Sequence, residues 1–99
     1  METEDIDKAA SLLQKNWDLL PPSDLDWESL LAALRVQMEH MLMNDFERLV
    51  QSMYRLDVAE SRFQLALALP SVPERAAALA TIVLDRELQR LATWRKYSG

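Results

Sequence analysis

Apolar residues recur along most of the chain at steps of three and four, the spacing that places side chains on one face of an α-helix. Thr3 stands before the first such series, where its hydroxyl could cap a helix. Pro21-Pro22 ends the series, because proline lacks a backbone N–H and restricts the residue before it. We therefore expect a first helix over about 4–20. Its apolar face contains Ile6, Ala10, Leu13, Trp17 and Leu20.

The second apolar series starts at Trp27 and stays in phase beyond Asn44, which favours one helix of about 30 residues and ~45 Å. Asn44 and Glu47, however, have the spacing of a capping box, which favours a break. We expect a break or a kink, with helices over about 25–43 and 45–56, and keep the continuous helix as the alternative. The apolar series contains Trp27, Leu31, Leu34, Met38, Met41, Leu42, Phe46, Leu49, Met53 and Leu56.

Two capping-box spacings mark further helix starts in the second half of the chain. The segment 57–60, Asp-Val-Ala-Glu, predicts a helix over about 58–69 that Pro70 ends. The segment 71–74, Ser-Val-Pro-Glu, predicts a last helix over about 72–97, with proline in its first turn. The apolar face of this last helix contains Ala77, Ala80, Leu84, Leu88, Leu91 and Trp94.

These series predict an all-α protein, an irregular bundle of four or five helices around a single core, with residues 1–99 as one helical domain. A length of 99 residues, with 49% apolar and 27% charged residues, is typical of such a domain. The single glycine, Gly99, agrees with this prediction, because β-hairpins and phosphate-binding loops usually require glycine.

Composition also narrows the classes of function. The absence of cysteine excludes disulfides and thiolate metal sites. No apolar run approaches the ~20 residues that span a bilayer, and the acidic N-terminus does not resemble a secretory signal, so we expect a cytoplasmic protein without a membrane partner. The net charge is −5, with −6 in residues 1–28, −1 in residues 29–69 and +2 in residues 70–99. Nucleic-acid modules usually have a basic excess, so we expect no nucleic-acid partner.

His40 is the only histidine of the chain. One histidine cannot supply the paired ligands of zinc or di-iron helical sites, and no serine has a spacing to it that indicates a catalytic triad. We therefore expect a surface histidine, no catalytic residue, no cofactor, no metal site and no enzymatic activity.

Some charged residues fall inside the apolar faces. Glu87 projects between Leu91 and Trp94, and a buried carboxylate must find a partner or take up a proton. Two inward carboxylates could instead form a general acid–base pair or a ligand site. We favour an ion-pair network in which Glu87 pairs with Arg55 or Arg48. The candidate network contains Glu87, Arg55, Arg48, Asp45 and Arg35.

A second group of residues is typical of a contact surface. Methionines cluster in the middle of the chain, and Met43 alone projects away from the apolar face. Basic and aromatic residues alternate near the C-terminus, a pattern that suits either helix capping or contact with an acidic protein surface. The candidate partner surface contains Arg86, Arg90, Trp94, Arg95, Tyr97 and Met43.

Three strings stand out in the sequence, and the second is the most distinctive: Asp45-Phe-Glu-Arg-Leu, Met53-Tyr-Arg-Leu-Asp-Val-Ala-Glu60 and Leu84-Asp-Arg-Glu-Leu-Gln-Arg90. In these strings the chain, over about residues 27–97, resembles a group of short uncharacterised bacterial proteins. The resemblance implies a small helical cytoplasmic domain and no activity, cofactor or catalytic residue.

We expect a non-enzymatic interaction or oligomerisation module whose partner is another protein or a second copy of the chain. The alternative is a small-ligand-binding or catalytic bundle that uses inward carboxylates, which predicts a cavity with convergent polar groups and shifted carboxylate pKa values. A third alternative is weak nucleic-acid contact through the basic last helix, which predicts binding that salt weakens.

Overall fold

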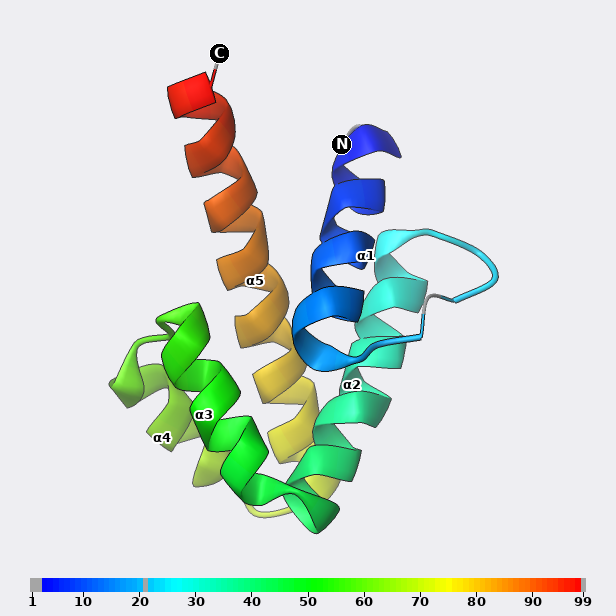
Figure 1. Cartoon of the computed structure of the whole chain (residues 1–99). Coiled ribbons are helices and arrows are strands. Elements are labelled where there is room, and N and C mark those ends of the chain that lie inside the picture. Colours follow the sequence, from blue (N-terminus) through cyan, green and yellow to red (C-terminus); the bar gives the residue numbers. More distant parts are fainter. Residues whose placement is uncertain (1–2, 21, 99) are drawn as a thin grey trace.

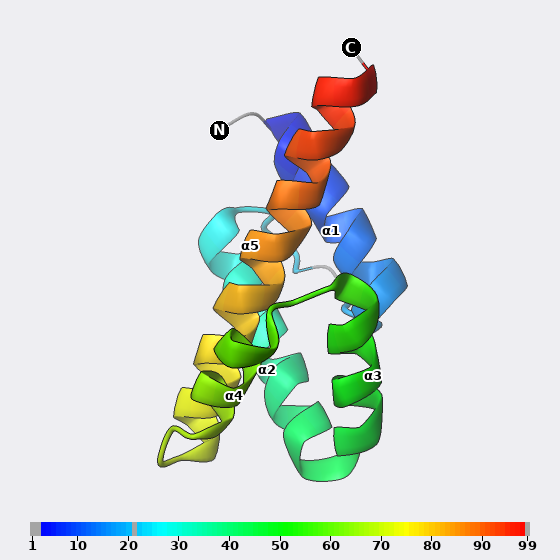
Figure 2. The ribbon, with the colours of Figure 1, turned by 90° about the vertical axis from the view of Figure 1, so that its left-hand side faces the viewer.

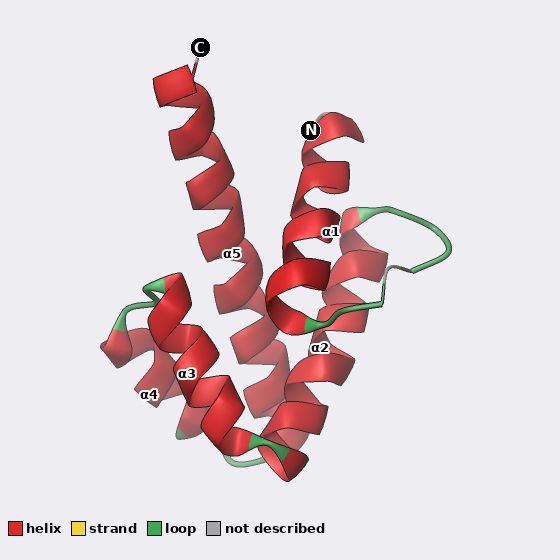
Figure 3. Ribbon diagram, viewed as in Figure 1, coloured by secondary structure: helices red, strands yellow, loops and turns green. Residues whose placement is uncertain are grey.

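The computed structural model describes residues 3–20 and 22–98, and the side chains of residues 5–20 and 22–93. Five helices and no strand are present in this part of the chain (Figures 1 and 3). The predicted all-α bundle is confirmed. The helices are α1 (Thr3–Trp17), α2 (Trp27–Asn44), α3 (Phe46–Leu56), α4 (Glu60–Leu67) and α5 (Val72–Ser98).

The long helix α5 organises the bundle. All four other helices contact it, and α2 makes the most extensive contact. In Figure 1, α1 and α2 lie on one side of α5 and α3 and α4 on the other, and the first turn of α1 and the last turn of α5 share one end of the molecule. Within the described residues, no helix combines the length and the apolarity that crossing a bilayer requires.

A single apolar core fills the space between the helices, as the periodicity predicts. Met38, Met41 and Met53 are buried in it, whereas Met43 is 66% exposed, in agreement with its projected direction. The largest fully buried apolar side chains are Trp17, Leu13, Leu30, Leu34, Met38, Met41, Leu49, Leu79 and Val83.

Two helix starts have side-chain caps. Asp26 caps α2, since its Oδ1 accepts from the backbone N–H of Ser29 at 2.7 Å, and this bond lowers the pKa of Asp26. At the start of α5 the backbone N–H of Glu74 donates to Ser71 Oγ at 3.2 Å, and the Ser71 hydroxyl donates to Glu74 Oε1 at 2.9 Å. The 71–74 spacing therefore marks a helix start correctly.

The capping-box prediction at Asp57 and Glu60 is wrong. Asp57 adopts the left-handed conformation, with φ 61°, and ends α3 instead of starting α4. The backbone N–H groups of Asp57 and Val58 donate to Tyr54 O at 3.1 Å and Met53 O at 3.2 Å, which satisfies carbonyls at the end of α3. Helix α4 starts at Glu60 without a side-chain cap and is shorter than predicted.

The end of α1 also differs from the prediction. The helix stops at Trp17, and Asp18 is left-handed with φ 54°. Aspartate tolerates this conformation better than most residues, which matters in a chain whose only glycine is terminal. The turn directs Leu19 into the core and leaves Leu20, which we placed on the apolar face, 82% exposed.

The middle helix breaks at Asp45, which has φ −152° and ψ 57°, so α2 and α3 are separate helices. No capping box makes this break. The Asn44 amide donates backward to His40 O at 3.1 Å, and Asp45 makes no side-chain cap.

Candidate functional site: a cationic cleft

A cleft of about 540 Å³ lies between the end of α1, one face of α3 and the middle of α5. Figure 2 shows the end of α1 above α3, with α5 beside both. We call it the cationic cleft. Its lining consists of Lys15, Asn16 and Trp17 from α1, Arg48, Gln51, Ser52, Arg55 and Leu56 from α3, and Arg90 from α5.

The polar face of α3 supplies most of this lining. Arg48, Gln51, Ser52 and Arg55 recur at steps of three and four, so they share one face of the helix. Leu49, Val50 and Met53, which lie between them, pack into or against the core. The amphipathic pattern that holds α3 on the bundle therefore also presents two guanidinium groups to the cleft.

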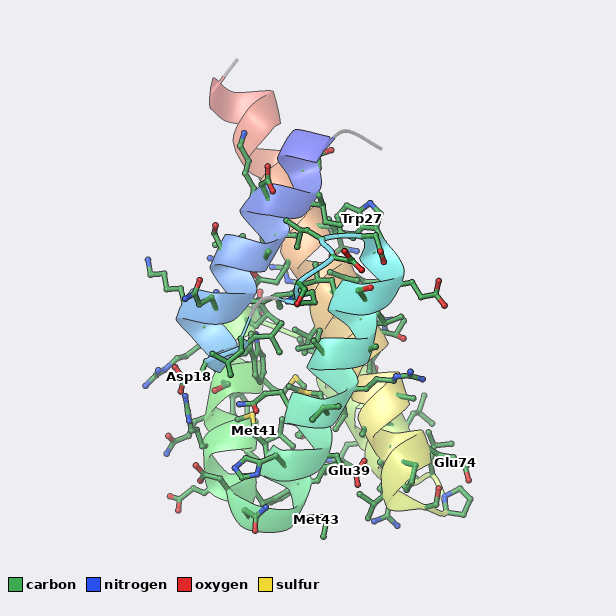
Figure 4. All side chains as sticks on the ribbon, turned by 90° about the vertical axis from the view of Figure 1, so that its right-hand side faces the viewer. Asp18, Trp27, Glu39, Met41, Met43 and Glu74 are labelled. Carbon is green, nitrogen blue, oxygen red and sulfur yellow. The ribbon has the colours of Figure 1, made fainter. Side chains whose placement is uncertain are left out.

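Two of the four cations of the cleft form ion pairs with acidic side chains that the structure describes, and two do not. Arg48 forms an ion pair with Asp18, which lies at the end of α1 next to α3 in Figure 4. Arg90 pairs with Glu87. Lys15 and Arg55 form no ion pair with any residue that the structure describes. The cleft therefore has an excess of positive charge, although the chain has a net charge of −5.

Trp17, one of the lining residues, has a buried hydrogen-bond donor without a partner in the part of the chain that the structure describes. Its side chain is 1% exposed and lines the cleft, and its Nε1 has no hydrogen-bond partner among the described residues. A buried donor without an acceptor costs about 1–3 kcal/mol.

Glu87 is completely buried, in agreement with its position on the apolar face of α5. Its Oε1 lies 3.4 Å from Arg90 Nη1, and its Oε2 has no hydrogen-bond partner among the described residues. Burial raises the pKa of Glu87, while Arg90, the Asn16 amide and Arg86 lower it to a smaller extent.

The predicted partners of Glu87 are wrong. Arg90, one turn along the same helix, forms the pair, whereas Arg48 is held by Asp18 and Arg55 lines the cleft. Asp45 and Arg35 are exposed and do not pair with Glu87, because the break at Asp45 turns this carboxylate away from the core, where it acts on Arg48 only as a nearby charge. The sequence suggested five network members, and three of them, Glu87, Arg48 and Arg55, lie in or beside the cleft.

Of the candidate partner surface, the structure describes the side chains of Arg86, Arg90 and Met43. The Arg86 Nε donates to Leu56 O at 3.0 Å and its Nη2 lies 3.7 Å from Asp57 Oδ2, so Arg86 ties α5 to the end of α3. Arg90 belongs to the cleft, and Met43 is exposed near the turn between α2 and α3 (Figure 4). The side chains of Trp94, Arg95 and Tyr97 lie outside the described residues.

Sequence reasoning missed Lys15, Asn16, Trp17, Gln51 and Ser52 as lining residues. The sequence places Trp17 in the core. Its spacing shows that the residue faces the bundle, but it does not show that part of this large side chain also borders a cleft. The polar series on α3 was the available signal, since its helical spacing is as regular as that of the apolar series.

A second concave feature is apolar. A smaller groove of about 150 Å³ runs between α3 and α4, and we call it the α3–α4 groove. Tyr54 and Phe46 at this groove are 71% and 45% exposed. Its lining residues are Phe46, Val50, Met53, Tyr54, Val58, Glu60, Phe63, Gln64 and Leu67.

These arrangements are suited to binding. Within residues 3–20 and 22–98, no three histidine, aspartate or glutamate side chains gather as metal ligands. The two carboxylates considered for acid–base chemistry, Glu87 and Asp45, are buried and exposed respectively, so they do not form a pair. Comparison with protein-family models, curated proteins and solved structures gave no match. The resemblance to short bacterial proteins therefore remains an expectation.

Proposed function

We propose that the protein is a non-enzymatic, cytoplasmic binding module that takes a small anionic ligand, a compound with carboxylate or phosphate groups, into the cationic cleft. The observation that carries the proposal is the convergence of Lys15, Arg48, Arg55 and Arg90 on one cleft. Guanidinium groups bind carboxylates and phosphates through two parallel hydrogen bonds.

The size and chemistry of the cleft support a small ligand. A volume of about 540 Å³ falls in the range of roughly 300–1,000 Å³ typical of small-molecule sites. The lining combines cations with the neutral polar residues Asn16, Gln51 and Ser52 and with the apolar surface of Leu56. Such a mixture orients a ligand through a few polar contacts.

The test is calorimetric titration of the protein with citrate and, separately, with pyrophosphate. We expect saturable binding that added salt weakens, since it depends on charge. Arg55→Ala should weaken binding about tenfold or more, because a hydrogen bond to a charged group contributes about 1.5–3 kcal/mol. Preference for one probe distinguishes a carboxylate ligand from a phosphate ligand.

Arg62→Ala is the matched control, because Arg62 is a half-exposed arginine that lies outside the cleft lining and pairs with Asp85 at 3.6 Å. It should bind both probes as the unmodified protein does. Failure of both probes to bind at millimolar concentration, or an equal loss in the two variants, would contradict the proposal.

The α3–α4 groove favours a second candidate function, the interaction module expected from the sequence. We infer that its occupant is the apolar face of an amphipathic helix with basic residues at its edges, from a partner protein. Phe46 and Tyr54 offer exposed aromatic surface for such a helix, and Glu60 lines the groove while Glu47 is exposed beside Phe46.

A labelled amphipathic peptide with lysine at its edges tests this second function by fluorescence anisotropy. Tyr54→Ala should weaken binding about tenfold, because removal of a central aromatic anchor typically costs more than 1 kcal/mol. Leu65→Ala is the control, since Leu65 is 72% exposed on α4 outside the groove. Equal binding of a peptide with glutamate at its edges would reject the charge argument, and light scattering would detect a second copy as the occupant.

A further inference from the structure

Two arginines of the cationic cleft already hold acidic partners, and these partners differ in burial. The Asp18 side chain, the partner of Arg48, is 63% exposed, whereas Glu87, the partner of Arg90, is 0% exposed. If an anionic ligand takes over Arg48, Asp18 remains in water as a hydrated carboxylate. Glu87 has no such option, because a buried carboxylate that loses its cation is strongly disfavoured.

We propose that the capture of an anion by Arg90 is coupled to the uptake of one proton by Glu87, so that the cleft binds its ligand and a proton together. This inference rests on the proposed function. The proton comes from the solvent buffer and forms an O–H bond on the Glu87 carboxylate. Its Oε2 has no hydrogen-bond partner among the described residues, so no bond to a protein donor has to be broken there.

Arg90 reaches both the cleft, where the ligand anion would bind, and the Glu87 carboxylate. Its guanidinium lines the cleft, with its side chain 33% exposed, and its Nη1 lies 3.4 Å from Glu87 Oε1. A separation of 3.4 Å is long for a charge-assisted hydrogen bond, which is commonly about 2.7–2.9 Å. A ligand anion that offers a shorter contact can therefore compete for the same guanidinium.

The other charged groups near Glu87 cannot replace Arg90. On the same helix, Arg86 is held by Leu56 O and Asp57. From α1, Asn16 lowers the pKa of Glu87 as a neutral group, and Lys15 lines the cleft where the ligand would be bound. From α3, Arg48 and Arg55 also face the cleft.

The two remaining helices supply no substitute either. On α4, Arg62 pairs with Asp85. On α2 the charged residues and the histidine are all exposed, namely Glu28, Arg35, Glu39 and His40.

The sign of the coupling follows from these positions. Burial raises the pKa of Glu87 above 4.5, and Arg90 is the main group that opposes this rise. A ligand anion neutralises Arg90, so the pKa of Glu87 rises further in the complex. Between the two pKa values the complex holds one more proton than the free protein, and affinity increases as pH falls, by up to about tenfold per pH unit. Outside that window Glu87 adds no pH dependence to the affinity.

Calorimetric titration with 1,2-ethanedisulfonate tests the coupling, because this dianion stays ionised through the pH range in which Glu87 titrates. The titration is repeated at one pH in two buffers with different ionisation enthalpies, and the difference gives the number of protons taken up. We expect uptake of up to one proton per ligand. Glu87→Gln, which imitates the protonated side chain, should bind without proton uptake and with an affinity that does not change with pH.

His40→Asn is the control, since His40 is exposed and is the only histidine. It should retain the proton uptake. Binding without proton uptake, or the same uptake in Glu87→Gln, would overturn the coupling and leave the proposed function intact. Absence of binding of 1,2-ethanedisulfonate would overturn the coupling, and absence of binding of citrate and pyrophosphate as well would overturn the proposed function, while circular dichroism confirms that each variant is folded.

Discussion

Replacement of Arg90 by methionine is expected to destabilise the protein by about 3 kcal/mol at pH 7, because it leaves Glu87 buried without a cation. The loss should depend on pH. In the variant the folded-state pKa of Glu87 is raised further above the unfolded value near 4.5, so the folded form gains protons that the unfolded form lacks. The destabilisation is therefore small below about pH 4.5, where Glu87 is protonated in both folded proteins. It grows as pH rises from the folded-state pKa of Glu87 in the unmodified protein to the higher pKa of Glu87 in the variant.

Urea denaturation of the Arg90→Met variant at low and neutral pH measures this effect. The double variant Arg90→Met with Glu87→Gln should recover most of the stability at pH 7, since it removes the charge that Arg90 compensates. Arg62→Met, which breaks the half-exposed pair with Asp85, should change stability by no more than about 1 kcal/mol. An equal loss at both pH values would mean that the Arg90 stem, and not its charge, stabilises the fold.

Leu34→Ala is expected to reduce the free energy of unfolding by about 3 kcal/mol. Leu34 is completely buried on α2, the helix with the most extensive contact with α5. Truncation removes apolar contacts and leaves a cavity that the neighbouring side chains fill only partly, and such changes typically cost about 2–5 kcal/mol.

Thermal and urea unfolding of Leu34→Ala measure this loss. Val36→Ala is the matched control on the same helix, because Val36 is 71% exposed and should change stability by about 0.5 kcal/mol or less. Similar effects in the two variants would contradict the packing of α2 against α5.

The helix ends show how far local sequence signals extend. The 71–74 spacing and Asp26 both mark helix starts, because the cap and the amide that it accepts from lie within three residues. Asp57 has an equally good cap spacing and yet ends a helix. The same side chain type that caps a start also tolerates the left-handed conformation, and the packing of α3 and α4 around α5 decides between them.

The cleft was predictable only in part. The burial of Glu87 follows from its place among the apolar residues of α5, and the basic face of α3 follows from its spacing. Their meeting with Lys15 and Trp17 required the end of α1 to lie beside both helices. No local spacing encodes that arrangement, because Lys15 and Trp17 stand 33 and 31 positions before Arg48, the first cleft residue on α3.

The sequence by itself determined that the chain is helical, which face of most helices is apolar, and that Glu87 would be buried, since periodicity alone sorts side chains between core and solvent. The tertiary structure decided where α1 and α3 end, which cation compensates Glu87, and that four basic side chains share one cleft. The physical reason is that helical spacing specifies a direction around one axis, whereas a site depends on how separate axes pack against each other.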